Sequence, residues 1–261
     1  MTANPLLEIR NLTRRFGGLE AAADVSFRVE TNAIVALIGP NGAGKTTVFN
    51  VVTGIYPPSE GDIVFCDSSV AGLRSDDICR LGIARTFQNI RLFAGMTVLE
   101  NVLVGRHTRT GSTLGDALIN SRRHRREEEE SRERARHLLR FVGVPGLEDE
   151  LASNLPYGLQ RRLEIARALA SEPKLILLDE PAAGLTPTEK SGLRELVLTM
   201  KEDGHTILLI EHCMKFVMGL SDHIVVLDHG RKISEGNPAA VRNDPAVIEA
   251  YLGVATEQAA S

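Results

Sequence analysis

The sequence predicts an α/β fold with a mainly parallel sheet, an N-terminal antiparallel β subdomain and an inserted α-helical subdomain. Two aliphatic runs, at 34–38 and 175–178, contain no polar residue, which is typical of strands covered on both faces of a sheet. Each run is followed by a segment with helical periodicity. Apolar and polar residues alternate at 25–30, as in a half-buried strand, and 63–65 is a second short candidate. Between about 95 and 165 the pattern is mainly helical.

Length and composition limit the function. The chain has 261 residues, a formal net charge of −4 and 43% hydrophobic residues. This charge argues against a chain-wide attraction to nucleic acid or anionic lipid, and we expect no nucleic-acid partner. The three cysteines show no metal-ligand spacing, which is typical of a reducing compartment. The opening residues lack a secretory pattern, and every apolar run is far shorter than the ~18 residues of a membrane span, so we expect a cytoplasmic protein.

The segment 122–136 is almost free of apolar residues. A nucleic-acid-binding arm is one interpretation of its arginines. A solvated helix is the better one, because the arginines and glutamates pair at a spacing of four residues. The expected pairs are Arg123 with Glu127, Arg126 with Glu130, Glu128 with Arg132, and Glu130 with Arg134.

The strongest motif follows the first aliphatic run and matches the phosphate-binding pattern G-x-x-x-x-G-K-T from Gly39 to Thr46. Its glycines let the backbone fold around a β-phosphate with N–H groups pointing inward, and the helix that starts there adds its dipole. Lys45 would supply a positive charge to the β- and γ-phosphates, and Thr46 a hydroxyl to Mg²⁺. A chance match in a glycine-rich turn is the alternative, against which the flanking strand and helix argue. The expected nucleotide contacts are Gly39, Pro40, Asn41, Gly42, Ala43, Gly44, Lys45, Thr46 and Thr47.

Two acids end the second aliphatic run, 134 residues after Lys45. Asp179 is placed to reach Mg²⁺ through water, and Glu180 to orient and polarise an attacking water as a general base. A helix cap before Pro181 is the alternative interpretation. The phosphate-binding motif favours the catalytic one, because both segments are expected at the same edge of one sheet.

With these motifs the chain resembles the ATP-binding-cassette (ABC) ATPases over nearly its whole length, which implies the P-loop NTPase core of that family. Three further residues stand where the family has functional ones. Phe16 resembles the aromatic that stacks on adenine. Gln88, in the run R-T-F-Q, resembles the glutamine that contacts Mg²⁺ and the attacking water and couples to the transmembrane partner. His212 resembles the switch histidine on the γ-phosphate.

The signature segment L-S-G-G-Q of the family is here Leu155-Pro-Tyr-Gly-Leu159. In the family this segment closes over the ATP of the opposite subunit, so the resemblance assigns Leu155 and Gly158 to the partner's nucleotide. Pro156 has neither the serine hydroxyl nor an N–H, and Leu159 lacks the amide of the usual glutamine. The signature segment is therefore expected to make fewer hydrogen bonds than usual to the ATP of the opposite subunit. The loop after Glu180 also lacks the aspartate that is common in the family.

These departures point to a subgroup. The Tyr-Gly signature, the loop P-A-A-G-L at 181–185 and the C-terminal run 244–253 resemble the larger ATPase subunit of branched-chain amino acid importers. A charged insertion near 106–140 is similar to the one in that subgroup. Cys213 differs from it, since an aspartate is usual after the histidine, and we expect only a local effect.

The resemblance implies an ATP-hydrolysing subunit of an importer, with ATP and Mg²⁺ as cofactors. Its partners would be two transmembrane permeases, a second ABC ATPase that is a different chain or an identical copy, and indirectly a substrate-binding protein, on the cytoplasmic face of the membrane. The chain would be a single ABC ATPase domain. About 1–88 and 166–261 would form the nucleotide-binding core with its β subdomain, and about 89–165 the helical subdomain that carries the signature.

Several alternatives stay open. The cargo could instead be an amide, urea or another amino acid, and a related cassette drives lipopolysaccharide export. A non-transport cassette of DNA repair or translation is a different class, against which the single phosphate loop and the lack of sustained heptads argue. A regulatory module with degenerate catalysis is a third, suggested by Pro156 and Leu159.

Overall fold

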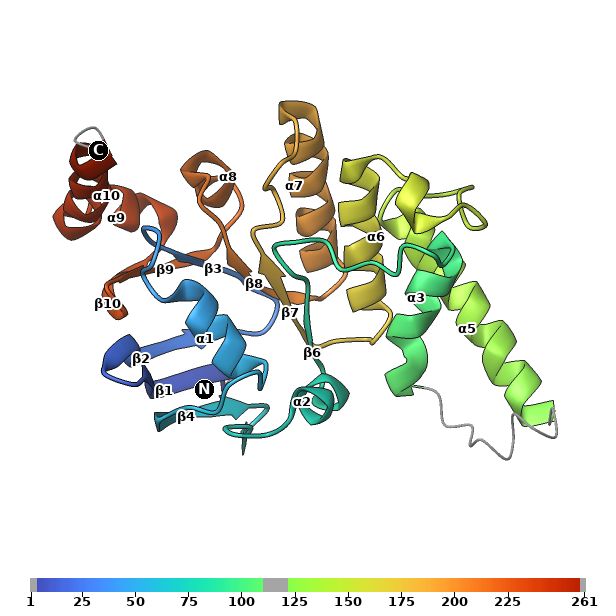
Figure 1. The fold of residues 1–261 in the computed structure, drawn as a ribbon, viewed down its shortest axis with the longest axis horizontal. Coiled ribbons are helices and arrows are strands. Elements are labelled where there is room, and N and C mark those ends of the chain that lie inside the picture. Colours follow the sequence, from blue (N-terminus) through green and yellow to red (C-terminus); the bar gives the residue numbers. More distant parts are fainter. Residues whose placement is uncertain (1–3, 110–121, 259–261) are drawn as a thin grey trace.

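The computed structural model describes residues 4–109 and 122–258, which form two sheets and a lateral group of helices (Figure 1). The first sheet is antiparallel, as the alternating N-terminal pattern predicted, and its strand order is β2-β1-β4-β5. Its strands are β1 (Leu7–Phe16), β2 (Leu19–Val29), β4 (Glu60–Phe65) and β5 (Ser68–Ser69).

The second sheet has the order β10-β9-β3-β8-β7-β6, and all its neighbours are parallel except β10, which runs antiparallel to β9. The two aliphatic runs form β3 and β7, and every residue of both strands is buried. The expected mainly parallel sheet is therefore confirmed. Its strands are β3 (Ile34–Ile38), β6 (Ile83–Arg85), β7 (Leu175–Asp179), β8 (Thr206–Ile210), β9 (His223–Asp228) and β10 (Arg231–Gly236).

Apolar residues fill both faces of this second sheet, which explains why its central strands do not alternate. In β3, Val35 and Leu37 point to a core shared with the antiparallel sheet and α1 (Lys45–Val52). Ala36 and Ile38 point to the other core, against α7 (Pro187–Glu202) and its neighbours. The other helices around the sheets are α2 (Ser75–Leu81), α8 (Met214–Met218), α9 (Pro238–Arg242) and α10 (Pro245–Gln258).

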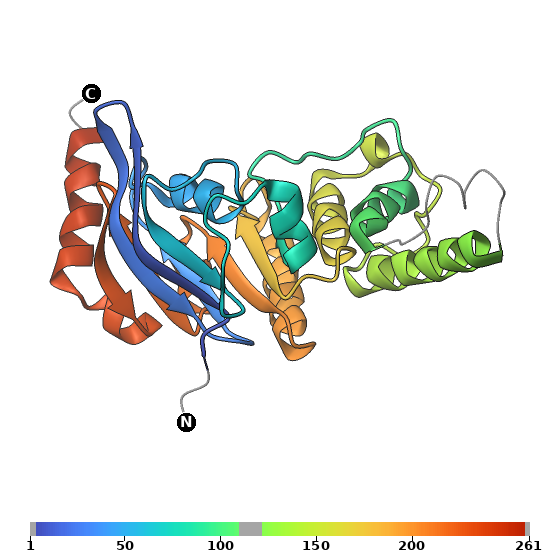
Figure 2. The same ribbon diagram turned by 90° about the horizontal axis from the view of Figure 1, so that it is seen from below.

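A group of helices extends beyond the β6 edge of the second sheet, seen at the right of Figure 2. It contains α3 (Val98–Arg106), the 3₁₀ turns His107–Arg109 and Ala152–Asn154, α5 (Arg122–Phe141) and α6 (Tyr157–Leu169). Helices α3 and α6 touch at Gly105, where an added Cβ would lie 2.1 Å from the Arg167 carbonyl oxygen. The helical insertion is thus present and is packed on the sheet through α6.

The charged segment is helical, as its spacing predicted. Arg126 pairs with Glu130 at 2.8 Å, and Arg132 with Glu128 at 2.9 Å. Glu130 makes no ion pair with Arg134 in this described segment, and the side chain of Arg123 lies outside the described residues. Among the helices that the structure describes, none combines the length and apolar character needed to cross a bilayer.

Candidate active site

The loop between β3 and α1 has a backbone that only glycine permits at two points. Gly39 has φ +150°, and a Cβ there would lie 2.0 Å from the Leu227 carbonyl oxygen. Gly44 has φ +94°, and a Cβ there would lie 2.3 Å from the Ala21 carbonyl oxygen. Helix α1 begins at Lys45, directly after the second glycine. The glycines of the motif therefore let the loop backbone pack closely against β9 and β2. The N-terminus of α1 then faces the concave side of the loop.

Lys45 is held inside this loop by its own backbone. Its Nζ donates hydrogen bonds to the carbonyl oxygens of Gly39 and Pro40, both at 2.8 Å, and its side chain is buried. Burial lowers the pKa of Lys45, while the nearby Glu180 and Asp179 act in the opposite direction. Two of the three ammonium hydrogens are used, so one is left to donate to a phosphate oxygen.

A cavity of about 410 Å³ opens in front of the loop. It is lined by most of the expected residues, namely Asn41, Gly42, Ala43, Gly44, Lys45, Thr46, Thr47, Glu180 and His212. Sequence reasoning missed the other side of the cavity, which β2 and the β9–β10 turn provide through Leu19, Glu20, Ala21, His229 and Gly230. Gly39 and Pro40 are not in the lining and contribute through their contacts with Lys45.

Phe16 does not line this cavity. It lies at the end of β1, 40% exposed, with its ring edge-on to Tyr56 at a centroid distance of 5.2 Å. The Arg14 guanidinium lies 4.6 Å from the centroid of the Phe16 ring. The expected adenine contact thus belongs to an exposed group of two aromatic rings and an arginine beside the cavity.

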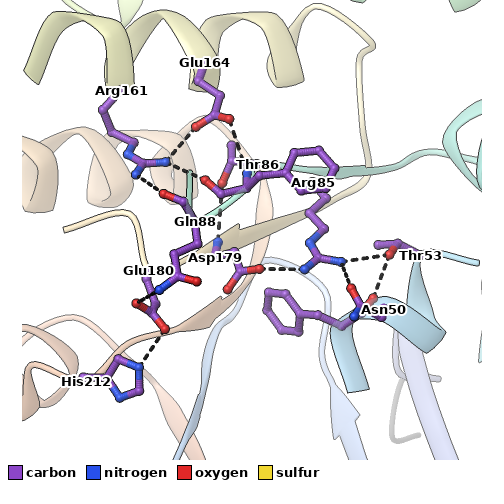
Figure 3. Close-up of polar contacts among 12 residues, drawn as sticks. Asn50, Thr53, Arg85, Thr86, Gln88, Arg161, Glu164, Asp179, Glu180 and His212 are labelled. Carbon is purple, nitrogen blue, oxygen red and sulfur yellow. Dashed lines mark hydrogen bonds and ion pairs between the residues drawn. The ribbon is translucent and has the colours of Figure 1, made fainter. Parts of the chain in front are cut away.

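Glu180 is the point at which three of the predicted residues meet (Figure 3). One carboxylate oxygen accepts from Gln88 Nε2 at 2.8 Å, and the other lies 2.7 Å from His212 Nε2. The Glu180 backbone has φ +46°, a left-handed conformation that costs a non-glycine residue about 1–2 kcal/mol. Its N–H donates to the Ile210 carbonyl oxygen at 3.0 Å, which ties this strained residue to the end of β8.

Glu211 supports this arrangement and was missed in the sequence. It is buried, and its carboxylate accepts from the backbone N–H of Ala182 at 2.7 Å and of His212 at 3.2 Å. Burial raises the pKa of Glu211, against the lowering effect of these backbone donors. Glu211 directly follows the aliphatic strand β8, and this position of an acid could have identified it in the sequence. Glu211 fixes both the loop after Glu180 and the backbone of His212.

Asp179 is almost fully buried and is paired with a residue that the sequence did not single out (Figure 3). Its Oδ2 lies 2.6 Å from Arg85 Nη2. Arg85 Nη1 donates to Asn50 Oδ1 on α1 at 2.7 Å and to Oγ1 of Thr53, the C-cap of α1, at 3.2 Å. Arg85 therefore joins the strand that ends in Asp179 to the helix that begins in the phosphate-binding loop.

The oxygen donors at this site fit Mg²⁺. Thr46 offers a hydroxyl and Asp179 a carboxylate of which Arg85 engages one oxygen. Gln88 contacts Glu180 through its nitrogen, which leaves its side-chain carbonyl as an acceptor. Such hard oxygen ligands are those that Mg²⁺ prefers, completed by water and phosphate oxygens. The part of the chain that the structure describes holds no cluster of three His, Cys, Asp or Glu residues suited to a metal ion.

The segment 155–159 lies on the helical group and does not line the cavity. Pro156 caps α6, and its carbonyl oxygen accepts from the N–H groups of Leu159 at 2.9 Å and Gln160 at 3.0 Å. The amides of Tyr157 and Gly158 precede these first bonds of the helix. Leu155 and Gly158 are both buried in this structure, and an added Cβ at Gly158 would lie 2.3 Å from Glu189 Oε1. Gln160, not identified from the sequence, donates its Nε2 to the Leu155 carbonyl oxygen at 2.8 Å.

Arg161 connects this helix to the segment of Gln88, another link that the sequence did not reveal (Figure 3). Its guanidinium is fully buried and donates to the carbonyl oxygens of Phe87 and Gln88 at 2.7 Å and to Glu164 Oε2 at 2.7 Å. Burial raises the pKa of Glu164, and the Arg161 charge opposes that shift. Helix α6 therefore holds the backbone from which Gln88 reaches Glu180.

A second cavity, of about 430 Å³, lies between the sheet edge and the helical group. We call it the lateral groove. Its lining includes Arg85, Phe87, Arg91, Phe93 and Arg167, which combine aromatic and basic side chains. The Arg91 guanidinium lies 4.3 Å from the centroid of the Phe87 ring. The lateral groove thus meets the active site at Arg85, which lines it and also pairs with Asp179.

Two family models match the chain. The model described as ABC transporter matches residues 22–183, and the model described as branched-chain amino acid ATP-binding cassette transporter matches residues 231–257. The high-affinity branched-chain amino acid transport ATP-binding protein LivG of Escherichia coli (strain K12) is 47% identical over 254 residues, covering 97% of this chain and all of LivG. The corresponding protein BraF of Pseudomonas aeruginosa is 46% identical with the same coverage.

Solved structures agree with this similarity. The ADP conformation of an ATP-binding cassette of an ABC transporter superposes with a TM-score of 0.84 at 34% identity, covering 96% of this chain and all of that one. A nucleotide-free cassette from an ABC transporter gives a TM-score of 0.83 at 34% identity, with 95% and 99% coverage. Both matches extend through the sheets and the helical group.

Proposed function

Because the chain belongs to the ABC transporter family of ATP-binding subunits, we propose that it hydrolyses ATP to drive the import of branched-chain amino acids. The observation that carries the hydrolytic part is the placement of Glu180 between Gln88 and His212, beside the cavity of the phosphate-binding loop. The cargo rests on the relatives, which are named as high-affinity branched-chain amino acid transport proteins and align along nearly the whole chain.

ATP would bind with its phosphates in the 410 Å³ cavity. Backbone N–H groups of the loop from Gly39 to Thr47 would donate to the phosphates, and the N-terminus of α1 favours negative charge. Lys45 would turn its free ammonium hydrogen toward the β- and γ-phosphates. Phe16 would stack on the adenine from the exposed edge of the β subdomain, with Arg14 and Tyr56 holding its ring.

Glu180 would act on the attacking water as general base. Gln88 and His212 orient its two carboxylate oxygens before ATP and water enter. Gln88 would also position the water, and His212 would turn its Nε2 from Glu180 to the γ-phosphate, which frees one Glu180 oxygen for the water. In this way Glu180, His212, Gln88 and Lys45 form the catalytic set, and the reaction needs no covalent intermediate on the protein.

Magnesium would neutralise charge that develops on the phosphate oxygens. The residues that would hold it are Thr46, Gln88 and Asp179, the last through water. Of these, Asp179 is the one that the surrounding structure fixes most firmly, because both its backbone and its carboxylate are bonded within a buried site.

A second cassette would complete the site. Leu155 and Gly158 would contact the ATP held by the opposite subunit, with the amide of Gly158 donating to the γ-phosphate from the N-terminus of α6. Two ATP molecules would then lie between two cassettes arranged head to tail. The partner cassette is proposed to be a different chain, as the resemblance favours, with an identical copy as the other arrangement.

Two transmembrane permeases would dock on the cytoplasmic side, and the lateral groove is the site that we assign to them. Its exposed Phe93 and Arg91 suit a permease segment with an aromatic or aliphatic anchor and an acidic residue. The chain would thus be cytoplasmic and peripheral at the membrane, without contact to nucleic acid, and would meet a substrate-binding protein only through the permeases. Residues 1–88 and 166–261 would serve as the nucleotide-binding core, and 89–165 as the helical subdomain.

The test is purification of the tagged chain from gently solubilised membranes, followed by reconstitution of the complex in liposomes. We expect two hydrophobic permeases and a second cassette to co-purify, and leucine with its binding protein to stimulate ATP hydrolysis and leucine uptake. The matched control is the same complex with Glu180→Gln, which should assemble equally well but neither hydrolyse nor transport. Recovery of soluble partners alone, or hydrolysis stimulated by another cargo and unaffected by leucine, contradicts the proposal.

A further inference from the structure

Arg85 joins three elements. It is the last residue of β6, three positions before Gln88, and its guanidinium reaches Asp179 at the end of β7, Asn50 on α1 and Thr53, which caps the C-terminus of α1. Its side chain is only 7% exposed, and the Asp179 side chain 4%. Burying an ion pair this deeply carries a large desolvation penalty unless its geometry is good. The pair is therefore weak evidence for a role in stability alone, which favours a role in function.

The contacts of Arg85 fix its guanidinium plane. Nη2 binds Asp179 Oδ2 at 2.6 Å, and Nη1 binds Asn50 Oδ1 at 2.7 Å. The guanidinium carbon also lies 5.5 Å from the centroid of the Phe49 ring and 5.2 Å from that of Phe87. A planar fork between aromatic rings is a geometry that arginine provides and lysine does not.

This geometry determines which oxygen of Asp179 the ion pair engages, at a residue that lies behind the lining of the nucleotide cavity. Because Arg85 engages Oδ2, the other oxygen remains for the metal site. Because the same guanidinium is anchored on α1, the carboxylate is held at a set distance from the helix that carries Lys45 and Thr46. Carboxylates that serve metals are commonly held by a hydrogen-bonding neighbour of this kind.

We propose that Arg85 is a positioning residue that orients Asp179 for Mg²⁺ and keeps it in register with the phosphate-binding loop. This inference rests on the proposed function, since it presumes that Mg²⁺ and ATP bind at this site. Arg85 also lines the lateral groove, so the groove and the metal carboxylate share this side chain.

The experiment measures the binding of trinitrophenyl-ATP to the purified full-length chain, first in EDTA and then during a titration with MgCl₂. With Arg85→Gln, we expect affinity in EDTA to stay within about twofold, because no contact of Arg85 is with nucleotide. The Mg²⁺ concentration at the midpoint should rise by roughly 10–100-fold, the usual loss when the neighbour of a metal carboxylate is removed. Arg85→Lys should give an intermediate midpoint. A matched control, Arg80→Gln, changes an exposed arginine on α2 and should leave the midpoint unchanged.

Two further variants separate positioning from a general structural role. Asp179→Asn should raise the midpoint by itself, and adding Arg85→Gln to it should raise the midpoint no further, because Arg85 acts through Asp179. If Arg85→Gln does not fold, Asn50→Ala removes only the anchor on α1 and should still raise the midpoint several-fold. A merely structural role would instead weaken binding equally in EDTA and in Mg²⁺.

The inference is overturned if Arg85→Gln and Asn50→Ala bind Mg²⁺ and nucleotide like the natural chain, or if the Arg85 and Asp179 effects add. It is separable from the proposed function. If the natural chain does not bind trinitrophenyl-ATP, or binds it no more tightly than Lys45→Ala does, the nucleotide site itself is wrong. If that binding is present and Mg²⁺-dependent but insensitive to Arg85, only the role of Arg85 fails.

Discussion

The carboxylate of Glu180 and the imidazole of His212 lie 2.7 Å apart, although 32 residues separate them in the chain. They meet because β7 and β8 are adjacent and parallel, with Asp179 in register with Ile210, so that the next residues leave the sheet at one edge. The Glu211 carboxylate then holds the backbone of His212 by accepting a hydrogen bond from its N–H. The parallel pairing of β7 and β8 therefore places Glu180 and His212 next to each other at the ends of two strands.

Replacing Glu180 with Gln tests this pair. The amide keeps the size of the side chain but removes the base, so we expect ATP affinity within about threefold of the natural chain and a hydrolysis rate lower by roughly 10²–10⁴-fold. Equilibrium binding and phosphate release measure the two effects separately. The control Glu195→Gln changes an exposed acid on α7 and should hydrolyse normally. Normal turnover in Glu180→Gln would remove Glu180 from the catalytic set.

Replacing Lys45 with Ala should act on binding itself. Hydrogen bonds to charged groups contribute about 1.5–3 kcal/mol, so we expect ATP affinity to fall by roughly 10–100-fold. Isothermal titration calorimetry gives the change directly. The Gly39 and Pro40 carbonyl groups also lose their donor, so thermal unfolding should be recorded in parallel. Lys174→Ala, at an exposed lysine, is the control for loss of charge, and equal affinities in the two variants would contradict the role of Lys45.

Breaking the buried pair of Arg161 and Glu164 should destabilise the fold. Arg161→Met leaves Glu164 unpaired and the Phe87 and Gln88 carbonyl groups without their donor, so the free energy of unfolding should fall by about 3–5 kcal/mol. Adding Glu164→Leu removes the stranded charge and should restore part of that loss. Urea titrations of the two variants measure the difference. A double variant no more stable than Arg161→Met would show that the stranded charge is not the cause.

The sequence was sufficient for those parts of the molecule that depend on local pattern. The aliphatic runs predicted β3 and β7 because a two-sided core leaves no place for a polar residue, and the glycine spacing predicted the phosphate-binding loop because the loop needs its unusual φ angles. The alternation at 25–30 predicted the antiparallel sheet, within the longer strand β2. Each of these signals lies within a dozen neighbouring residues.

The missed residues act across long distances in the chain. Arg85 lies 94 positions from Asp179, and Arg161 is 73 positions from Gln88. Nothing in the local sequence of an arginine tells whether it is solvated or buried, because that depends on which strands become neighbours. For the same reason the far wall of the nucleotide cavity, at His229 and Glu20, came only from the topology that brings β2 and the β9–β10 turn together.

His205 should make the stability of the fold depend on pH. It precedes β8, and burial lowers its pKa below the ordinary value of 6.5, although Asp203 acts in the opposite direction. The unfolded chain therefore binds the proton more readily than the folded one. The contribution of neutral His205 to the free energy of unfolding is complete above the pKa of His205 in the unfolded chain. It is lost as the pH falls toward the lower pKa of His205 in the folded chain, and it changes no further below that pKa.

Urea midpoints measured from pH 7.5 down to about 5.5 should therefore fall more steeply for the natural chain than for His205→Gln, which has no proton to take up. The exposed His137→Gln is the matched control and should follow the natural chain. If His205→Gln retained the full slope, the pH dependence would have another source. If its slope were steeper, the folded chain would bind the His205 proton more tightly than the unfolded one, contrary to the burial that lowers the pKa of this ring.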